Sequence, residues 1–154
     1  MSKENINIYQ KLTKNVIKFF KKIIKISEIN MEFPNDLKYQ ATHEWAKIEG
    51  DICTVGISAH AQDQLGEIVF VELPSVGDAL EKGAVAANVE SSKAVGEVVT
   101  PFTGEVTAVN ENLEDEPEVV NSEPYGAGWI FKIKISNAAE ADGLLDAAGY
   151  QATL

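Results

Sequence analysis

The alternation of apolar and polar residues along most of the chain predicts short β-strands. Residues 129–135 alternate most clearly, with aromatic and isoleucine side chains on one face and lysines on the other. Residues 45–49 and 52–57 flank Gly50-Asp51, a pair typical of a hairpin turn. Four further β-prone segments follow, at 67–73, 84–90, 95–100 and 104–109. Many short strands separated by turn residues favour a β-sandwich or a small barrel, and we expect a sandwich.

Helical signals in the same region are short. Ser58 is a suitable N-cap for a helix that runs through Leu65, and Gly66 stands where a glycine would end it. The tail, residues 137–150, is expected to form a C-terminal helix with Asn137 as its cap. Residues 110–127 are expected to form a long acidic loop. The fold class predicted is therefore mostly β, with short helices at the periphery and a C-terminal helix.

The first thirty residues follow a different pattern, so we divide the chain into an extension, 1–30, and a domain, 31–154. Apolar residues recur in the extension at helical spacing with lysines between them, namely Tyr9, Leu12, Val16, Phe19, Phe20 and Ile23. No apolar run approaches the length of a membrane span, so we expect no stable membrane insertion. The extension has no visible partner surface in the remaining chain, and we expect it to contribute nothing to the core.

Three interpretations of the extension remain open. It is a basic amphipathic helix or tail that touches anionic membranes, an organellar presequence, or a stretch upstream of a true start at Met31. The absence of arginine and the early Glu4 count against the presequence. The domain pattern begins directly after Met31, which favours the third interpretation.

Charge separates the two parts as sharply as periodicity does. The net charge is −11, but residues 1–30 hold seven Lys and two Glu, whereas the rest holds six Lys and twenty-two Asp or Glu. An acidic domain of this kind repels phosphate backbones, which argues against nucleic-acid binding.

The scarcity of cysteine and histidine limits the chemistry further. Cys53 is the only cysteine, so no disulfide can form within the chain, and its β-prone surroundings predict a buried thiol. With His43 and His60 the chain has three Cys or His side chains, fewer than the four of a structural zinc site. No Ser-His-Asp set or nucleotide-binding loop is apparent, so nothing indicates an enzyme with its own active site.

Lys93 is the most informative residue of the domain. It lies between two β-prone segments that are flanked by matched turns, Pro74-Ser75-Val76-Gly77 and Pro101-Phe102-Thr103-Gly104. The chain thus folds back as two similar halves with Lys93 at the tip of a hairpin, where a lysine is solvated and accessible. This placement favours an attachment point for a prosthetic group. Gly77 and Gly104 fit tight turns that need φ > 0.

Several ordered motifs connect Lys93 with a known family. They are His43-Glu44-Trp45, Gly56-Ile57-Ser58 with His60-Ala61-Gln62, the run from Leu65 to Pro74, Glu90-Ser91-Ser92-Lys93-Ala94, and Pro124-Tyr125-Gly126 followed by Trp129. At these residues, from about Leu37 to Tyr150, the chain resembles the H-protein family of the glycine cleavage system. The resemblance implies a lipoyl/biotinyl-carrier-like β-sandwich, also called a barrel-sandwich hybrid.

The resemblance also implies a cofactor and a set of site residues. Lys93 would carry lipoate in amide linkage. Biotin is the less suitable group, because biotin carriers typically have Met on both sides of the lysine, whereas Ser92 and Ala94 flank Lys93. Glu90, Glu97, Gly77 and Gly104 match positions that shape the hairpin and direct lipoylation. Glu44 and Glu97 match acids that hold the aminomethyl group in a surface cleft. Gln64 stands where some relatives have His.

The function implied is that of a carrier without its own active site, and we expect a monomer. Its partners would be a pyridoxal-phosphate-dependent glycine decarboxylase (P protein), a tetrahydrofolate-dependent aminomethyltransferase (T protein), dihydrolipoyl dehydrogenase (L protein) and a lipoylating enzyme. Two alternatives stay open: an H-like relay of lipoyl or octanoyl groups in lipoate assembly or sulfur metabolism, and a binding module with unmodified Lys93. The expected location is the cytoplasm of a prokaryote, or the mitochondrial matrix if residues 1–30 are a presequence.

Overall fold

The computed structural model describes residues 2–29 and 32–154, which divide into two compact units, Met1–Glu32 and Phe33–Leu154. The first unit consists of one helix, α1 (Lys3–Ile29). Met31, the alternative start considered above, lies outside the described residues.

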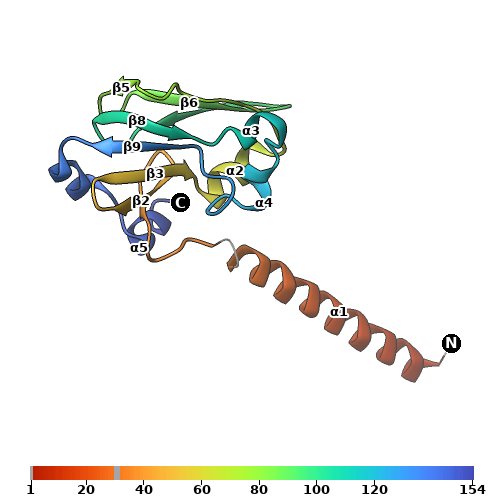
Figure 1. Cartoon of the computed structure of the whole chain (residues 1–154). Coiled ribbons are helices and arrows are strands. Elements are labelled where there is room, and N and C mark those ends of the chain that lie inside the picture. Colours follow the sequence, from red (N-terminus) through yellow and green to blue (C-terminus); the bar gives the residue numbers. More distant parts are fainter. Residues whose placement is uncertain (1, 30–31) are drawn as a thin grey trace. The chain divides into compact units, whose positions relative to one another are not determined.

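The second unit is built from antiparallel strands in two sheets (Figure 1). The larger sheet has the order β1-β2-β3-β9-β8-β5, and the smaller has the order β4-β6-β7. The strands are β1 (Lys38–Tyr39), β2 (Glu44–Glu49), β3 (Ile52–Ile57), β4 (Ile68–Glu72), β5 (Ala79–Leu80), β6 (Val85–Ser91), β7 (Val95–Val99), β8 (Gly104–Val109) and β9 (Phe131–Ile135). The mostly-β sandwich predicted from the sequence is confirmed.

The main core lies between the two sheets. Val55 and Phe131 of the larger sheet and Val89 and Val98 of the smaller are fully buried in one cluster. Side chains alternate between the two faces of a strand, so the same residues that predicted strands also supply this core. In β9, for example, Phe131 and Ile133 are fully buried, whereas Lys132 and Lys134, which alternate with them, are not.

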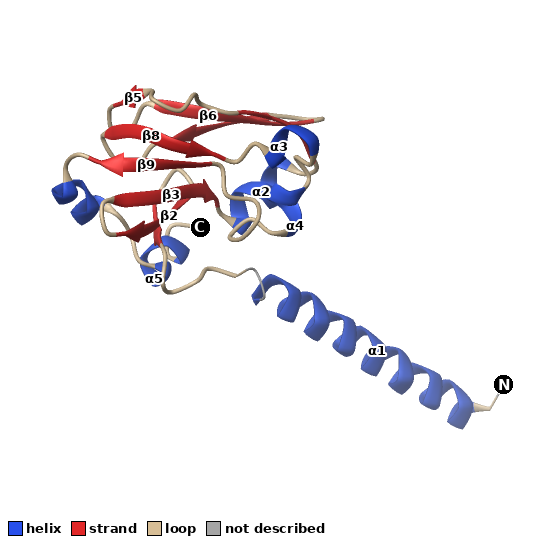
Figure 2. Cartoon of the chain, in the orientation of Figure 1, coloured by secondary structure: helices blue, strands red, loops and turns tan. Residues whose placement is uncertain are grey.

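The local turn and cap signals are also confirmed. Glu49 pairs with Ile52 around the Gly50-Asp51 turn. Helix α2 (Ala59–Leu65) begins at Ser58, whose side chain accepts a hydrogen bond from the Ala61 N–H at 3.2 Å. It ends at Gly66, with φ at 81°. Figure 2 shows the short helices at the ends and edges of the sheets.

The prediction of a long acidic loop at 110–127 is wrong. The segment contains two short helices, α3 (Asn112–Asp115) and α4 (Val119–Ser122). Each places one apolar side chain in the main core, Leu113 at 1% exposure and Val120 at 0%. Both lie among acidic residues that conceal the apolar anchors in the sequence.

The C-terminal tail is helical in two pieces rather than one. A 3-10 helix, η1 (Ala138–Gly143), is capped by Asn137 as predicted, and α5 (Ala147–Gln151) follows. Between them Leu145 exchanges main-chain hydrogen bonds of 2.8 Å with Tyr39, an extended pairing that a continuous helix could not make. The Glu140 carboxylate, three residues after this cap, accepts hydrogen bonds from the main-chain N–H and the hydroxyl of Thr103, both at 2.9 Å.

A second, aromatic cluster joins α5 to strands β1 and β2. Tyr39 and Tyr150 stack with ring centroids 4.9 Å apart, and Trp45 is 2% exposed. A Cβ on Gly56 would lie 2.6 Å from the Trp45 ring, so this glycine is required by close packing. The Trp45 Nε1–H donates to the Pro124 carbonyl at 2.9 Å, which brings two of the distant sequence motifs together.

Candidate functional site

Lys93 lies exposed in the tight turn that joins β6 to β7. The hydroxyl of Ser91 holds this turn, because it accepts hydrogen bonds from the N–H groups of Lys93 at 3.3 Å and Ala94 at 3.1 Å. The Ser91 N–H donates to the Ala94 carbonyl at 2.8 Å and closes the turn. The main chain of Lys93 is therefore held in place while its side chain is accessible. In the sequence, Ser91 was named only as part of the motif around Lys93 and this role was not predicted, although a serine two residues before a turn residue is a recognised signal for such a bond.

The C-terminal end of α2 lies against the Lys93 side chain. A Cβ built on Gly66 would be 3.2 Å from the Lys93 Cε atom and 3.7 Å from Nζ. Asn121 fixes this end of α2: its Nδ2 donates to the Gly66 carbonyl at 2.8 Å, and its Oδ1 accepts from the Ile68 N–H at 2.9 Å. Asn121 was missed in the sequence because it lies in the segment that we expected to be a loop.

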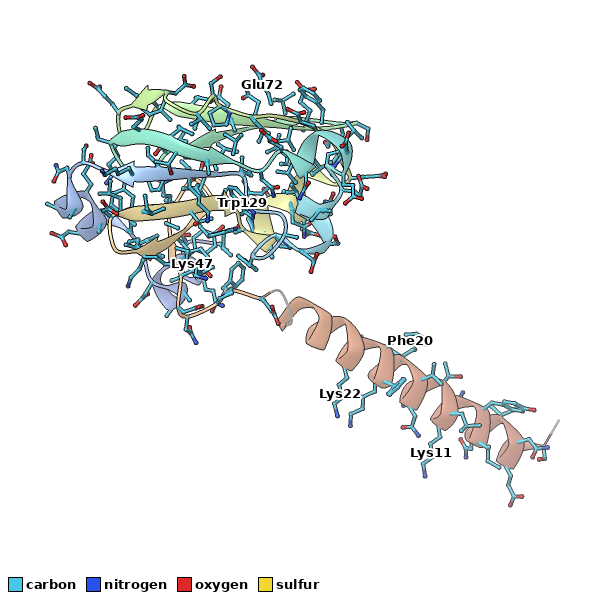
Figure 3. The ribbon with its side chains drawn as sticks, in the orientation of Figure 1. Lys11, Phe20, Lys22, Lys47, Glu72 and Trp129 are labelled. Carbon is cyan, nitrogen blue, oxygen red and sulfur yellow. The ribbon has the colours of Figure 1, made fainter. Side chains whose placement is uncertain are left out.

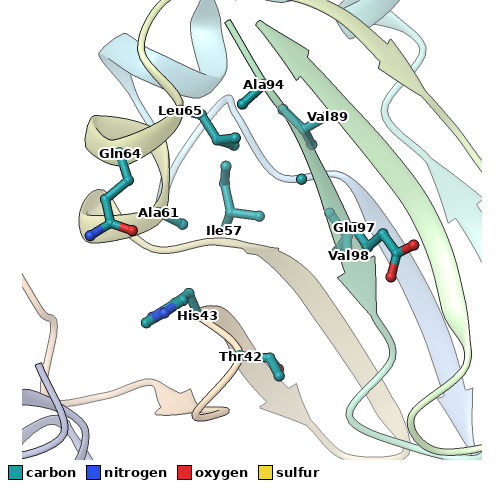
Figure 4. Close-up of a pocket in the computed structure, with 11 residues that line it drawn as sticks. Thr42, His43, Ile57, Ala61, Gln64, Leu65, Val89, Ala94, Glu97 and Val98 are labelled. Carbon is teal, nitrogen blue, oxygen red and sulfur yellow. The ribbon is translucent and has the colours of Figure 1, made fainter.

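A cleft of about 300 Å³ opens beside this turn (Figure 4). Its walls come from α2, from β7 and the neighbouring β6, from the end of β3 and from the segment that precedes β2. Most of the lining is apolar, and four residues with polar side chains also border it. The lining residues are Thr42, His43, Ile57, Ala61, Gln64, Leu65, Val89, Ala94, Gly96, Glu97 and Val98. Ala94, the neighbour of Lys93, is among them, so the cleft begins one residue from the lysine.

The side chain of Glu97 lies outside the cleft wall that Gly96 and Val98 form. Val98 is fully buried, and a Cβ on Gly96 would lie 3.1 Å from the Leu65 Cδ1 atom. Because side chains alternate along a strand, the Glu97 side chain takes the opposite, exposed face. In Figure 4 its carboxylate lies across the strand from Ile57.

The main chain of Glu97 nevertheless borders the cleft. Strand β7 is an edge strand, and the N–H and C=O of Val99 point away from β6. They bond to the Glu44 Oε1 atom at 3.1 Å and to the Gln40 Nε2 atom at 3.0 Å. Main-chain groups of an antiparallel edge strand point the same way at every second residue, so those of Glu97 also point away from β6. Glu97 can thus offer a carbonyl oxygen to an occupant of the cleft.

Glu44 is buried at 1% exposure and is not among the residues that line the cleft. Its carboxylate accepts hydrogen bonds from the Thr42 hydroxyl, from Gln40 Nε2 and from the Val99 N–H. Burial raises the pKa of Glu44, and the hydrogen bonds from Thr42 and Val99 oppose that shift. Thr42 does line the cleft, so Glu44 touches the site through this hydroxyl and joins the two sheets at Val99.

His43 borders the other end of the cleft with an unusual backbone conformation, φ 82°. Its Nδ1 atom lies 2.7 Å from the Tyr150 hydroxyl, which is also 2.7 Å from the Ser58 Oγ atom. The His60 ring is 4.9 Å from the His43 ring. Burial lowers the pKa of His43, and the neighbouring His60 lowers it further.

Glu90 lies on the outer face of the small sheet in one row with two exposed apolar residues. It pairs with Phe70 on β4 and with Val95 on β7, and paired residues of an antiparallel sheet share a face. Phe70 is 49% and Val95 is 62% exposed. The row lies directly beside the Lys93 turn and gives an enzyme a mixed acidic and apolar surface to contact.

Glycine is required at the two turn positions, Gly77 and Gly104, for different physical reasons. Gly77 has φ 97°, which agrees with the prediction. Gly104 is not among the glycines with positive φ, so that part of the prediction is wrong. A Cβ there would lie 1.9 Å from the Lys134 carbonyl oxygen, so Gly104 is required by the close approach of β8 to β9. The two halves do lie together, since the Gly77 N–H donates to the Val106 carbonyl at 2.8 Å.

Three further features of the described residues relate to the chemistry considered in the sequence. Within residues 2–29 and 32–154, no group of three His, Cys, Asp or Glu side chains is placed to hold a metal ion. Cys53 is fully buried as predicted, and burial raises the pKa of its thiol to about 12. None of the described helices is long and apolar enough to cross a membrane.

Comparisons with known proteins identify the family of the domain. A family model described as "Glycine cleavage H-protein" matches residues 37–154. The "Glycine cleavage system H protein" of Alteromonas mediterranea is 60% identical over 119 residues, 77% of this chain and 92% of that protein. Its counterpart in Bacteroides fragilis is 48% identical over 124 residues, 80% of this chain and 98% of that protein.

A solved structure agrees as well. The crystal structure of a glycine cleavage system H protein from Mycobacterium marinum superposes with a TM-score of 0.72 at 37% identity. The match covers 79% of this chain and 100% of that chain. Helix α1 lies outside the residues that the family model matches.

Proposed function

This chain belongs to the glycine cleavage H-protein family, and on that premise we propose that it carries the aminomethyl group of glycine on a lipoyl group attached to Lys93. The observation that carries the proposal is the exposed lysine in a fixed turn, one residue from the start of an apolar cleft. A carrier of this kind serves other proteins' active sites and has no active site of its own.

The residues around Lys93 fit a lipoyl group. The lysine amine is accessible, and the turn is held by Ser91 rather than by the lysine itself, so acylation of Nζ leaves the turn intact. The cleft volume of about 300 Å³ and its apolar lining suit the hydrocarbon part of such an arm. When attached, the lipoyl group supplies a dithiolane whose sulfur atoms accept a one-carbon group and are reoxidised after it has left.

The polar residues of the cleft are suited to hold a protonated amine. The Thr42 hydroxyl donates to Glu44, so its oxygen lone pairs face the site with added negative character. The Glu97 carbonyl and the Gln64 side chain, both at the cleft, are further acceptors. The Glu44 carboxylate behind Thr42 attracts a cation without needing to touch it. These groups orient the amine and keep it from water while the carrier moves between partners.

Recognition by partners would use the surface around the hairpin. Glu90, between Phe70 and Val95, presents a carboxylate beside the lysine to the lipoylating enzyme. The second unit is acidic, which favours partners with basic surfaces. The partners proposed are the glycine decarboxylase, the aminomethyltransferase and dihydrolipoyl dehydrogenase. Tethering would give the arm an effective concentration on the order of mM at each of them.

The names of the relatives favour this role over a relay of lipoyl or octanoyl groups. Those relatives are bacterial, which supports a prokaryotic cytoplasm over a mitochondrial matrix.

A loading experiment tests the proposal. The lipoylated protein is incubated with a glycine decarboxylase and radiolabelled glycine, and label on the protein is counted. We expect label on the wild type and none on Lys93→Arg, which keeps the charge but cannot be acylated in the same way. The proposal would fail if the lipoylated wild type stayed unlabelled while a relative's H protein was labelled by the same enzyme.

A further inference from the structure

Helix α1 separates its charges and its apolar residues onto opposite faces. At about 100° of rotation per residue, its lysines up to residue 22 fall within about 100° of arc. These are Lys3, Lys11, Lys14, Lys18, Lys21 and Lys22. The aromatic residues lie on the opposite half, and Tyr9, Phe19 and Phe20 are 62%, 62% and 59% exposed. Figure 3 shows Lys11 and Lys22 on one side of the helix and Phe20 on the other.

The lysine face repels itself in water. Lys14 and Lys22 each lie four residues from Lys18, and like charges at this spacing destabilise a helix. Glu4 is the one acidic residue in the first half of the helix. Across the residues that the structure describes, the one salt bridge joins Lys47 to Glu49 and lies outside α1. A surface of negative charges would remove this repulsion.

The width of the apolar face of α1 indicates what kind of surface could bury it. It spans about half of the helix circumference, which is wider than the narrow seam of a coiled coil. A broad face bearing aromatic and aliphatic residues, opposed by lysines, is the pattern of a helix that lies in the boundary between lipid headgroups and acyl chains. The helix does not qualify as a membrane span, so it would lie flat.

From these observations we propose that α1 is a membrane-surface anchor that binds bilayers containing anionic lipids. The phenyl and aliphatic side chains enter the apolar boundary, and the lysines contact the headgroup phosphates. The acidic second unit, with its excess of fifteen negative charges, is repelled by the same headgroups and stays in water. Anchoring therefore leaves the Lys93 turn accessible, and it does not depend on what Lys93 carries.

The test is flotation of the full chain with vesicles of phosphatidylcholine alone or mixed with phosphatidylglycerol. We expect binding to the mixed vesicles only, weakened at least about tenfold by high salt, with a gain of helical circular dichroism. Binding that is equal on the two kinds of vesicle, or absent from both, would overturn the proposal. Self-association without lipid that high salt abolishes would also overturn it, since it would identify a second copy as the partner.

Two variants with unchanged composition sharpen the test. Phe20→Lys combined with Lys22→Phe exchanges residues between the faces, and we expect at least about tenfold weaker binding. Asn15→Lys combined with Lys22→Asn exchanges residues within the polar face, and binding should stay within about twofold of the wild type. Equal binding by both variants would contradict a facial mechanism. Label transfer from glycine should be unchanged in both, which separates this test from that of the carrier function.

Discussion

The Cε atom of Lys93 lies 3.2 Å from the position that a Cβ would take on Gly66. Gly66 ends α2 with φ 81° and ψ −154°, a conformation that is essentially restricted to glycine. One residue therefore stops the helix and leaves room for the side chain that is to be modified. The close approach of Lys93 thus explains why the Leu65-Gly66 part of the sequence motif requires a glycine.

Gly66→Ala should slow lipoylation as well as lower stability. The backbone conformation alone should cost about 1–3 kcal/mol of unfolding free energy, and the added methyl group should displace Lys93. Gly83→Ala is the matched control, because Gly83 has φ 87° and nothing within 4 Å of its Cβ position. Both variants should lose stability in urea denaturation, but only Gly66→Ala should be modified more slowly. Equal modification rates, measured where both are folded, would refute the contact's role.

Ser91→Ala should reduce the rate of lipoylation by releasing the Lys93 turn. The change removes the acceptor for the N–H groups of Lys93 and Ala94, with an expected loss of about 1 kcal/mol in stability. Ser92→Ala, at the exposed neighbouring position, is the control. Initial rates with a lipoylating enzyme should fall for Ser91→Ala and recover partly for Ser91→Thr. If Ser92→Ala had the larger effect, the turn would not be held as described.

Glu97→Gln should leave the lifetime of the loaded carrier within about twofold of the wild type. The reason is that Glu97 borders the cleft with its main chain, while its side chain lies on the exposed face. The measurement is the decay of radiolabel from the loaded protein after the decarboxylase is removed. A decay many times faster than that of the wild type would mean that the carboxylate itself holds the amine.

Glu44→Ala should lower the unfolding free energy of the domain, independently of any effect on the lipoyl arm. It leaves the Val99 N–H and the Thr42 hydroxyl without their acceptor and removes one of two hydrogen bonds of the Gln40 amide, at a cost of about 2–4 kcal/mol in urea denaturation. A loss below about 0.5 kcal/mol would contradict this structural role. Glu44→Gln keeps the shape and removes the charge, so it is the better variant for measuring the lifetime of the loaded carrier.

The same residue predicts a pH dependence. Burial raises the folded-state pKa of Glu44 above its ordinary value of 4.5, so the folded chain binds this proton more tightly than the unfolded chain. Its contribution to stability is greatest below pH 4.5 and is lost as the pH rises through the folded pKa. As the pH rises from 4.5 through the folded-state pKa, the wild type should therefore lose unfolding free energy relative to Glu44→Gln. A difference that is constant with pH would show that the pKa is not raised.

Local signals in the sequence were sufficient for much of the fold. The Gly50-Asp51 turn, the Ser58 cap and the Gly66 stop each depend on residues close in the chain, and the structure has all three. The exposed turn at Lys93 also follows from its own neighbours. These features need no knowledge of distant contacts.

The features that sequence reasoning missed depend on distant partners. Leu113 is a single apolar residue beside acids, and Val120 belongs to a short Val-Val pair after Glu118, so only the core that they enter explains their helices. The break between η1 and α5 depends on the pairing of Leu145 with Tyr39, more than a hundred residues earlier in the chain. The separation of the Glu97 main chain from its side chain could likewise be found only once β7 was known to be an edge strand.

The most direct test of the central claim is the intact mass of the protein purified from its own lipoate-replete cells, followed by peptide mapping across residues 85–100. We expect a mass increase equal to one lipoyl group, located on Lys93 and absent from Lys93→Arg. An unmodified Lys93, or a lipoyl group on another lysine, would contradict the carrier function and leave a binding domain with the family's fold.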